Sequence, residues 1–130
     1  MTQSGSILIV DDDQDIREIL RFILEAQHYR VDVAADGVDA LKHLTDGHRP
    51  ALILLDLMMP RMDGEQFLKK LGDGPFAAVP VVILSGNSCA RKKAIELNAR
   101  GCLMKPVEFE ELLSTVRRFV PSPWKKSDVA

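Results

Sequence analysis

The sequence predicts an α/β protein in which a doubly wound, five-stranded parallel sheet is covered on both faces by five helices. Two observations predict this class. Short apolar runs alternate with longer amphipathic segments along most of the 130 residues, which is typical of strands joined by right-handed helical crossovers. The strand-like runs are mostly apolar at every position, as expected when helices cover both faces of a parallel sheet.

The first half of the chain contains three of the predicted strands and two of the helices. Residues 7–10 form a continuous apolar run, and the apolar residues after it recur at helical spacing from position 16 to position 24. Residues 29–35 predict a second, weaker strand. Apolar residues at every third position predict a helix over 37–45, and the fully apolar residues 51–55 predict the third strand.

The second half repeats this alternation. Residues 64–71 can form a short helix, residues 81–84 form an apolar strand entered at a proline, and residues 90–99 predict a helix rich in basic side chains. Residues 102–104 predict the fifth strand. Residues 108–120 predict a final helix, because their apolar positions lie on one face.

Composition and charge bound the domain organisation and the function. The length suits one domain that buries its core without disulfides or a structural metal. We expect this domain over residues 7–120, with a polar lead over 1–6 and a flexible tail over 121–130, which holds two prolines and two lysines. The 17 basic and 19 acidic residues give a net charge of −2, which supplies no bulk attraction to nucleic acid or membranes.

The predicted cellular location follows from the cysteines and the apolar runs. The two cysteines form neither a disulfide framework nor a CxxC metal site, which favours a reducing compartment. No signal peptide precedes the first strand, and the apolar runs have the length of strands rather than of membrane spans. We therefore expect a cytoplasmic protein.

Three carboxylates are predicted to meet at the carboxyl edge of the sheet. Asp11 and Asp12 follow the first strand and Asp56 follows the third, and sites in such sheets form at this edge, where the strand order reverses. Two unit charges about 4 Å apart repel by roughly 4 kcal/mol at an effective dielectric of about 20. The cluster therefore needs a bound cation, a lysine or raised pKa values, and Mg²⁺ prefers such oxygen ligands. Asp13 and Asp15 are expected instead to cap the following helix.

The same edge is predicted to offer a hydroxyl and an ammonium group. Ser85 ends the fourth strand and Lys105 follows the fifth. A carboxylate nucleophile, a cation, a hydroxyl donor and a lysine together can hold a phosphoryl group. The bond between Lys105 and Pro106 is a candidate for the cis form, because only bonds preceding proline adopt it at low cost.

Four stretches closely resemble the receiver domain of response regulators. They are Ile7–Asp12 (ILIVDD), Leu54–Gly64 (LLDLMMPRMDG), Val82–Gly86 (VILSG) and Gly101–Pro106 (GCLMKP), in the order and spacing of that family. The resemblance extends from about residue 7 to residue 120. It implies the flavodoxin-like receiver fold with strand order 2-1-3-4-5, and transfer of a phosphoryl group from a histidine to an aspartate.

By motif position, the resemblance implies a role for each residue of the acidic cluster. Asp56 would be the phosphoacceptor. Asp11 and Asp12 would organise Mg²⁺, with Asp12 binding it directly and Asp11 through water, and Met58 would contribute its backbone carbonyl. Asp56 would be the remaining carboxylate ligand of the metal.

The resemblance also implies partners and an output. Ser85 and Lys105 would bind phosphoryl oxygens and move toward them, and the surface near the fourth helix and fifth strand would change. A sensor histidine kinase or phosphotransfer protein would be the donor, and a downstream effector protein would be the target, with no nucleic acid or membrane partner. We expect a stand-alone regulator that is not an enzyme, although it assists its own phosphorylation and dephosphorylation.

The chain departs from the family pattern in three places. Cys102 stands where the family usually has a tyrosine or phenylalanine that reports the position of the serine, and a cysteine cannot do this in the same way. The segment between Ser85 and Lys105 is about two residues shorter than usual, most simply in the loop before the fourth helix. Val107 replaces a frequent phenylalanine.

Three other functions fit parts of the sequence. Asp11 and Asp13 form an Asp-x-Asp pair after a strand, as in haloacid-dehalogenase-like phosphatases, although Asp15 stands where those enzymes usually have threonine or valine. A flavodoxin-like cofactor binder would need a loop that attracts phosphate, whereas this loop is acidic. The third alternative is a receiver-like interaction module that acts independently of phosphorylation.

Overall fold

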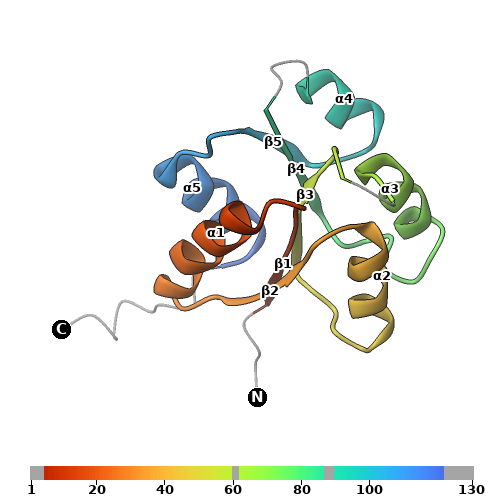
Figure 1. The fold of residues 1–130 in the computed structure, drawn as a ribbon, viewed down its shortest axis with the longest axis horizontal. Coiled ribbons are helices and arrows are strands. Elements are labelled where there is room, and N and C mark those ends of the chain that lie inside the picture. Colours follow the sequence, from red (N-terminus) through yellow and green to blue (C-terminus); the bar gives the residue numbers. More distant parts are fainter. Residues whose placement is uncertain (1–4, 60–61, 87–89, 122–130) are drawn as a thin grey trace.

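The computed structural model describes residues 5–59, 62–86 and 90–121, which form a parallel sheet with strand order β2-β1-β3-β4-β5 (Figure 1). The strands are β1 Ser6–Val10, β2 Arg30–Ala34, β3 Leu52–Asp56, β4 Val81–Ser85 and β5 Gly101–Met104. The helices are α1 Gln14–Ala26, α2 Gly37–Thr45, α3 Gly64–Gly72, α4 Ala90–Glu96 and α5 Phe109–Phe119. The predicted fold class and strand order are confirmed.

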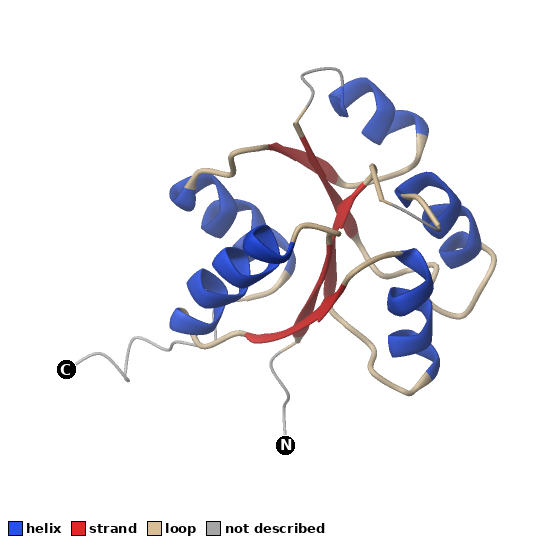
Figure 2. Ribbon diagram, viewed as in Figure 1, coloured by secondary structure: helices blue, strands red, loops and turns tan. Residues whose placement is uncertain are grey.

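The helices form a layer on each face of the sheet. Figure 2 shows α1 and α5 on one face and α2, α3 and α4 on the other. Within β1, Ile7 and Ile9 pack with the residues of α1 and α5, whereas Leu8 and Val10 pack with those of α2 and α3. Successive side chains of a strand point to opposite faces, so the continuous apolar run of β1 is buried on both sides.

Of the two aspartates expected to cap helix α1, Asp13 is the N-cap, whereas Asp15 lies within the first turn and donates to that cap. The Asp13 side chain accepts hydrogen bonds from the backbone N–H of Asp15 at 2.9 Å and of Ile16 at 3.3 Å. These bonds satisfy two of the donors that the start of a helix leaves open. The cap fixes the point at which the chain turns from β1 into α1.

Helix α4 is shorter than predicted. It ends at Glu96 rather than at residue 99, because Asn98 adopts the left-handed backbone conformation, with φ of 61°. The N–H of Ala99 then bonds back to the carbonyl of Ala94 at 2.8 Å, which closes the helix. The shorter connection predicted before α4 falls on residues 87–89, which lie outside the described residues.

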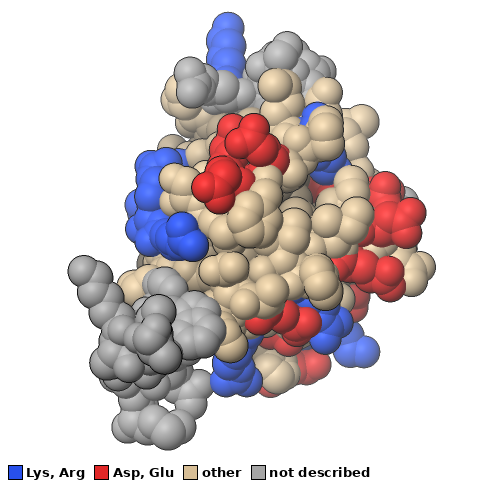
Figure 3. All heavy atoms as spheres, turned by 90° about the vertical axis from the view of Figure 1, so that its left-hand side faces the viewer, with Lys and Arg blue, Asp and Glu red and all other residues tan. Residues whose placement is uncertain are grey.

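The ends of the domain are only partly described. Strand β1 begins at Ser6, within the predicted lead, and the predicted tail beyond residue 121 lies outside the described residues. No helix in the described ranges has the length and apolarity needed to cross a membrane. On the left-hand side of Figure 1, which faces the viewer in Figure 3, acidic and basic side chains are interspersed, in keeping with the small net charge.

Candidate functional site

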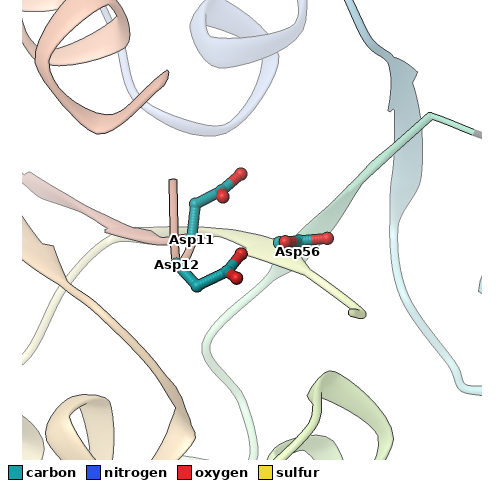
Figure 4. A group of neighbouring side chains, drawn as sticks. All are labelled: Asp11, Asp12 and Asp56. Atoms are coloured by element: carbon teal, nitrogen blue, oxygen red, sulfur yellow. The ribbon is translucent and has the colours of Figure 1, made fainter. Parts of the chain in front are cut away.

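Three carboxylates gather at the carboxyl ends of β1 and β3 (Figure 4). Val10 lies opposite Leu55 in the β1–β3 ladder, so Asp11 and Asp12 leave β1 beside Asp56, the last residue of β3. One oxygen of each carboxylate lies within 4.8 Å of the other two. Asp11 and Asp56 are buried whereas Asp12 is exposed. The predicted convergence is therefore present, with two of the charges removed from water.

Asp11 is the most deeply buried of the three. Its Oδ1 accepts a hydrogen bond from the backbone N–H of Asp13 at 2.9 Å, and its Oδ2 lies 2.8 Å from Lys105 Nζ. The contact with Lys105 is a close ion pair, and no other donor of the described residues reaches Oδ2. The buried charge of Asp11 is therefore balanced mainly by Lys105.

Asp56 carries an unusually basic carboxyl group. Burial is the main reason why its pKa is raised to about 6, and the charge of Asp11 and a hydrogen bond with Asp12 act in the same direction. The N–H of Met58, which donates to Asp56 Oδ1 at 3.1 Å, and the charge of Lys105 lower the pKa in part. Within the cluster, the ionised form of Asp56 is therefore the one that its surroundings disfavour.

Lys105 provides the positive charge at the centre of the site. Its ammonium group lies 2.8 Å from Asp11 and 3.6 Å from Asp56. Burial alone would lower its pKa, but the contact with Asp11 and the charges of both carboxylates outweigh burial and raise the pKa. Lys105 is therefore charged at neutral pH, and it is the lysine that the acidic cluster was expected to need.

Ser85 and Lys105 are joined through their backbones. In the β3–β4 ladder Asp56 lies opposite Leu84, so Ser85 is one position beyond it at the same edge. The backbone N–H of Lys105 donates to the carbonyl of Ser85 at 2.7 Å, which ties the end of β4 to the end of β5. The peptide bond from Lys105 to Pro106 is cis, as predicted.

Cys102 lies on β5 opposite Ile83 of β4, and it is half-buried. Three positions separate it from Lys105 along the chain. The departure noted in the sequence therefore lies on the strand that leads into Lys105, and α4 packs against this strand.

One basic residue at the site was not predicted. Arg17 Nη1 donates a hydrogen bond to the backbone carbonyl of Asp11 at 2.7 Å. The available signal was its position in α1, four residues after the cap Asp13. Side chains of a helix lean toward its N-terminus, so a long side chain at this position can reach back to the end of β1.

The oxygen atoms of the cluster fit a hard divalent cation. Mg²⁺ is held by one or two carboxylates and keeps several waters, and the exposure of Asp12 leaves the cluster open to solvent on one side. The donor set therefore matches the cofactor that the resemblance implies.

Comparison with protein families identifies the class. Residues 7–117 match the family model of the response regulator receiver domain. The chain belongs to this family, whose members are signalling modules of two-component systems. This membership sets aside the haloacid-dehalogenase-like and flavodoxin-like alternatives.

Individual relatives agree with this assignment. Response regulator Rre1 of Synechocystis sp. is 36% identical over 132 residues, which cover 98% of this chain and 57% of Rre1. Response regulator MprA of Mycobacterium sp. is 39% identical over 116 residues, covering 85% of this chain and 48% of MprA. The chain thus spans about half the length of the curated relatives that it matches.

Solved structures show the same fold. A putative response regulator from Chloroflexus aurantiacus superposes with a TM-score of 0.83 at 30% identity, covering 90% of this chain and 98% of that one. The chemotaxis response regulator CheY4 of Vibrio cholerae gives a TM-score of 0.81 at 30% identity, covering 90% and 99%. These two structures match this chain over nearly their whole length.

Proposed function

We propose that this protein accepts a phosphoryl group on Asp56 from a phosphohistidine of a sensor kinase or phosphotransfer protein. The observation that carries the proposal is the placement of Lys105 between a buried, basic carboxylate and the Asp11–Asp12 pair. Family membership supports signalling by phosphorylation in general. The proposal adds the acceptor residue and the role of each neighbour.

The transfer is an exchange of one bond for another at phosphorus. A carboxylate oxygen of Asp56 forms a bond to phosphorus while the bond from phosphorus to the donor imidazole breaks, and the electron pair of that bond stays on the nitrogen. Burial helps the attack because it leaves the carboxylate poorly solvated and more basic. The backbone N–H of Met58 holds Oδ1 in place.

The acidic pair would hold Mg²⁺ beside Asp56. Asp12 would bind the ion directly, Asp11 through water, and Asp56 and the backbone carbonyl of Met58 would complete the protein ligands. When bound, the ion offsets the repulsion between an anionic donor and an anionic nucleophile. Lys105 already provides one positive charge near Asp56, and it would pair with a phosphoryl oxygen after transfer.

Ser85 and Lys105 would carry the output. Ser85 would donate a hydrogen bond to the new phosphoryl group, and Lys105 would be drawn from Asp11 toward it. Because the two residues are linked by a backbone hydrogen bond, their movement would shift the ends of β4 and β5 together. An effector protein would recognise the changed surface near α4 and β5.

Finer statements about the setting also belong to the proposal. We infer that the protein acts in the cytoplasm through protein–protein contact, without nucleic acid or membrane partners. The small net charge supports the absence of a nucleic-acid partner.

The function is tested with fluoroberyllate, which imitates a phosphoryl group on a carboxylate. We expect Mg²⁺ and fluoroberyllate together to shift the amide NMR signals of Asp56, Ser85 and Lys105 in the wild type and not in Asp56→Asn. Asp73→Asn, which changes an exposed carboxylate at the end of α3, is the matched control and should respond like the wild type. Absence of any response in the wild type would favour the interaction module that works without phosphorylation.

A further inference from the structure

We propose that Arg17 is a positioning residue for the acidic pair, which it orients and whose charge it offsets. This inference rests on the proposed function, because it concerns the Mg²⁺ ligands of the same site. Arg17 Nη1 donates to the backbone carbonyl of Asp11 at 2.7 Å, a short, charge-assisted hydrogen bond. The side chain is half-buried, which protects that bond from competition by water.

The hydrogen bond acts on the peptide unit between the two carboxylates. The carbonyl of Asp11 and the N–H of Asp12 belong to one planar peptide group, so a donor that fixes the carbonyl also fixes the direction in which Asp12 leaves the strand. Before this peptide, the N–H of Asp11 continues the β1–β2 ladder by donating to Ala34 at 3.2 Å. After it, the Asp13 cap holds the start of α1.

Arg17 therefore holds the peptide group that lies between the end of β1 and the N-cap of α1. The side-chain bond from Asp13 N–H to Asp11 Oδ1 spans the same turn, but it depends on the carboxylate that the metal would also use through water. The hydrogen bond from Arg17 is made to the backbone carbonyl of Asp11, so it does not occupy either oxygen of the Asp11 carboxylate. Orientation and metal binding can therefore be satisfied together.

The charge of Arg17 adds to that of Lys105. Among the described residues, the cluster holds three carboxylates, two of them buried, and Lys105 forms ion pairs with the two buried ones. Arg17 makes no ion pair within the described ranges, so its charge is not neutralised by a carboxylate elsewhere on the surface.

Arg21 offers a matched control on the same helix. It lies one turn further along α1, it is exposed, and its Nε pairs with Glu25 at 3.2 Å in the i, i+4 arrangement. Replacing Arg21 removes the same charge from the same helix without touching the β1–α1 turn. A general effect of helix charge or of α1 stability would appear in both variants, whereas positioning would appear only at Arg17.

The test is a titration with magnesium chloride, followed by amide NMR signals, of the wild type, Arg17→Met, Arg17→Lys and Arg21→Met. We expect Arg17→Met to weaken Mg²⁺ binding at least about threefold, because a charge-assisted hydrogen bond is lost beside the ligands. Arg17→Lys should recover part of the affinity, since an ammonium group can donate to the same carbonyl. Arg21→Met should bind like the wild type.

A second readout needs no metal. The carbonyl ¹³C signal of Asp11 should move in Arg17→Met and stay in place in Arg21→Met, because only the first loses a bond to that oxygen. Wild-type affinity in Arg17→Met, or equal losses in Arg17→Met and Arg21→Met, would overturn the inference. If Arg17→Met does not fold, Arg17→Gln, which carries a shorter and uncharged polar side chain, takes its place: an unmoved Asp11 signal with wild-type affinity in that variant would overturn the inference. A wild type that does not bind Mg²⁺ would overturn the proposed function instead.

Discussion

The chemistry of the site depends on a carboxylate that the fold makes unfavourable to ionise. Asp56 ends β3, the middle strand of the sheet, where burial raises its pKa to about 6. Asp11 is buried beside it and Lys105 lies between the two. The resting protein therefore stores electrostatic cost at Asp56, and a bound cation or a change of charge on that residue would relieve it.

The raised pKa predicts a pH dependence of stability. Between the ordinary value of 3.8 and about 6, the folded state binds more protons at Asp56 than the unfolded state does. Stability from this group should therefore fall as pH rises through that window and stay level above it. Urea unfolding of the wild type and of Asp56→Asn between pH 4 and 8 measures the difference.

In that experiment, we expect Asp56→Asn to be more stable than the wild type at neutral pH without Mg²⁺. The gain should be on the order of 1–3 kcal/mol, because one pKa unit corresponds to about 1.4 kcal/mol. The gain should vanish toward pH 4. Asp73→Asn, at an exposed position, should show no such profile, and a variant Asp56→Asn that is less stable at every pH would contradict this account.

At the scale of elements, two junctions hold the site together. The turn from β1 into α1 carries Asp11 and Asp12 and is closed by the Asp13 cap. The ends of β4 and β5 are joined by the bond from the Lys105 N–H to the Ser85 carbonyl. The first junction presents the carboxylates, and the second links Ser85 and Lys105, the proposed phosphoryl-binding residues, to the strand against which α4 packs.

The cap predicts a local loss of stability. Asp13→Ala removes the acceptor for two N–H groups of α1, and capping substitutions of this kind cost about 1 kcal/mol. Urea unfolding should show this loss. Asp15→Ala is the control, because Asp15 is an acidic residue of the same turn whose side chain is not the cap. This substitution should cost less stability. Equal losses in the two variants would contradict the role of the Asp13 side chain.

The second junction predicts that Lys105→Ala separates phosphorylation from output. Asp56 and the acidic pair remain, so the variant should still accept a phosphoryl group. Its β5 and α4 amide signals should respond far less than those of the wild type, because the group that is drawn toward the phosphoryl oxygen is gone. An NMR response identical to that of the wild type would contradict this role of Lys105.

At the scale of the whole molecule, the predictable and unpredictable features have different physical origins. Continuous apolar runs predicted the strands because a sheet buried on both faces admits few polar residues, whereas the strand order came only from the resemblance. Adjacent aspartates gave no sign that Asp11 would be buried and Asp12 exposed, since this depends on the twist of the chain after β1. The contact of Arg17 also depends on the path of α1. Helix α4 ends at Glu96 because Asn98 adopts a left-handed backbone conformation, which the apolar pattern does not reveal.

Binding of Mg²⁺ should stabilise the molecule as a whole. A ligand that binds the folded state alone adds about 1.4 kcal/mol at a tenfold excess over its Kd, so the thermal midpoint should rise by several degrees. Asp12→Ala removes an exposed residue without disturbing the core, and it should abolish most of this rise. Asp15→Ala should keep it, and an undiminished rise in Asp12→Ala would contradict the metal assignment.

The most direct test of the central claim is the intact mass after incubation with Mg²⁺ and acetyl phosphate, for the wild type and Asp56→Asn. We expect one added phosphoryl group on the wild type, none on Asp56→Asn and none when Mg²⁺ is withheld. Addition to Asp56→Asn would place the acceptor elsewhere. No addition to the wild type, with no response to fluoroberyllate, would contradict the claim that this site accepts a phosphoryl group.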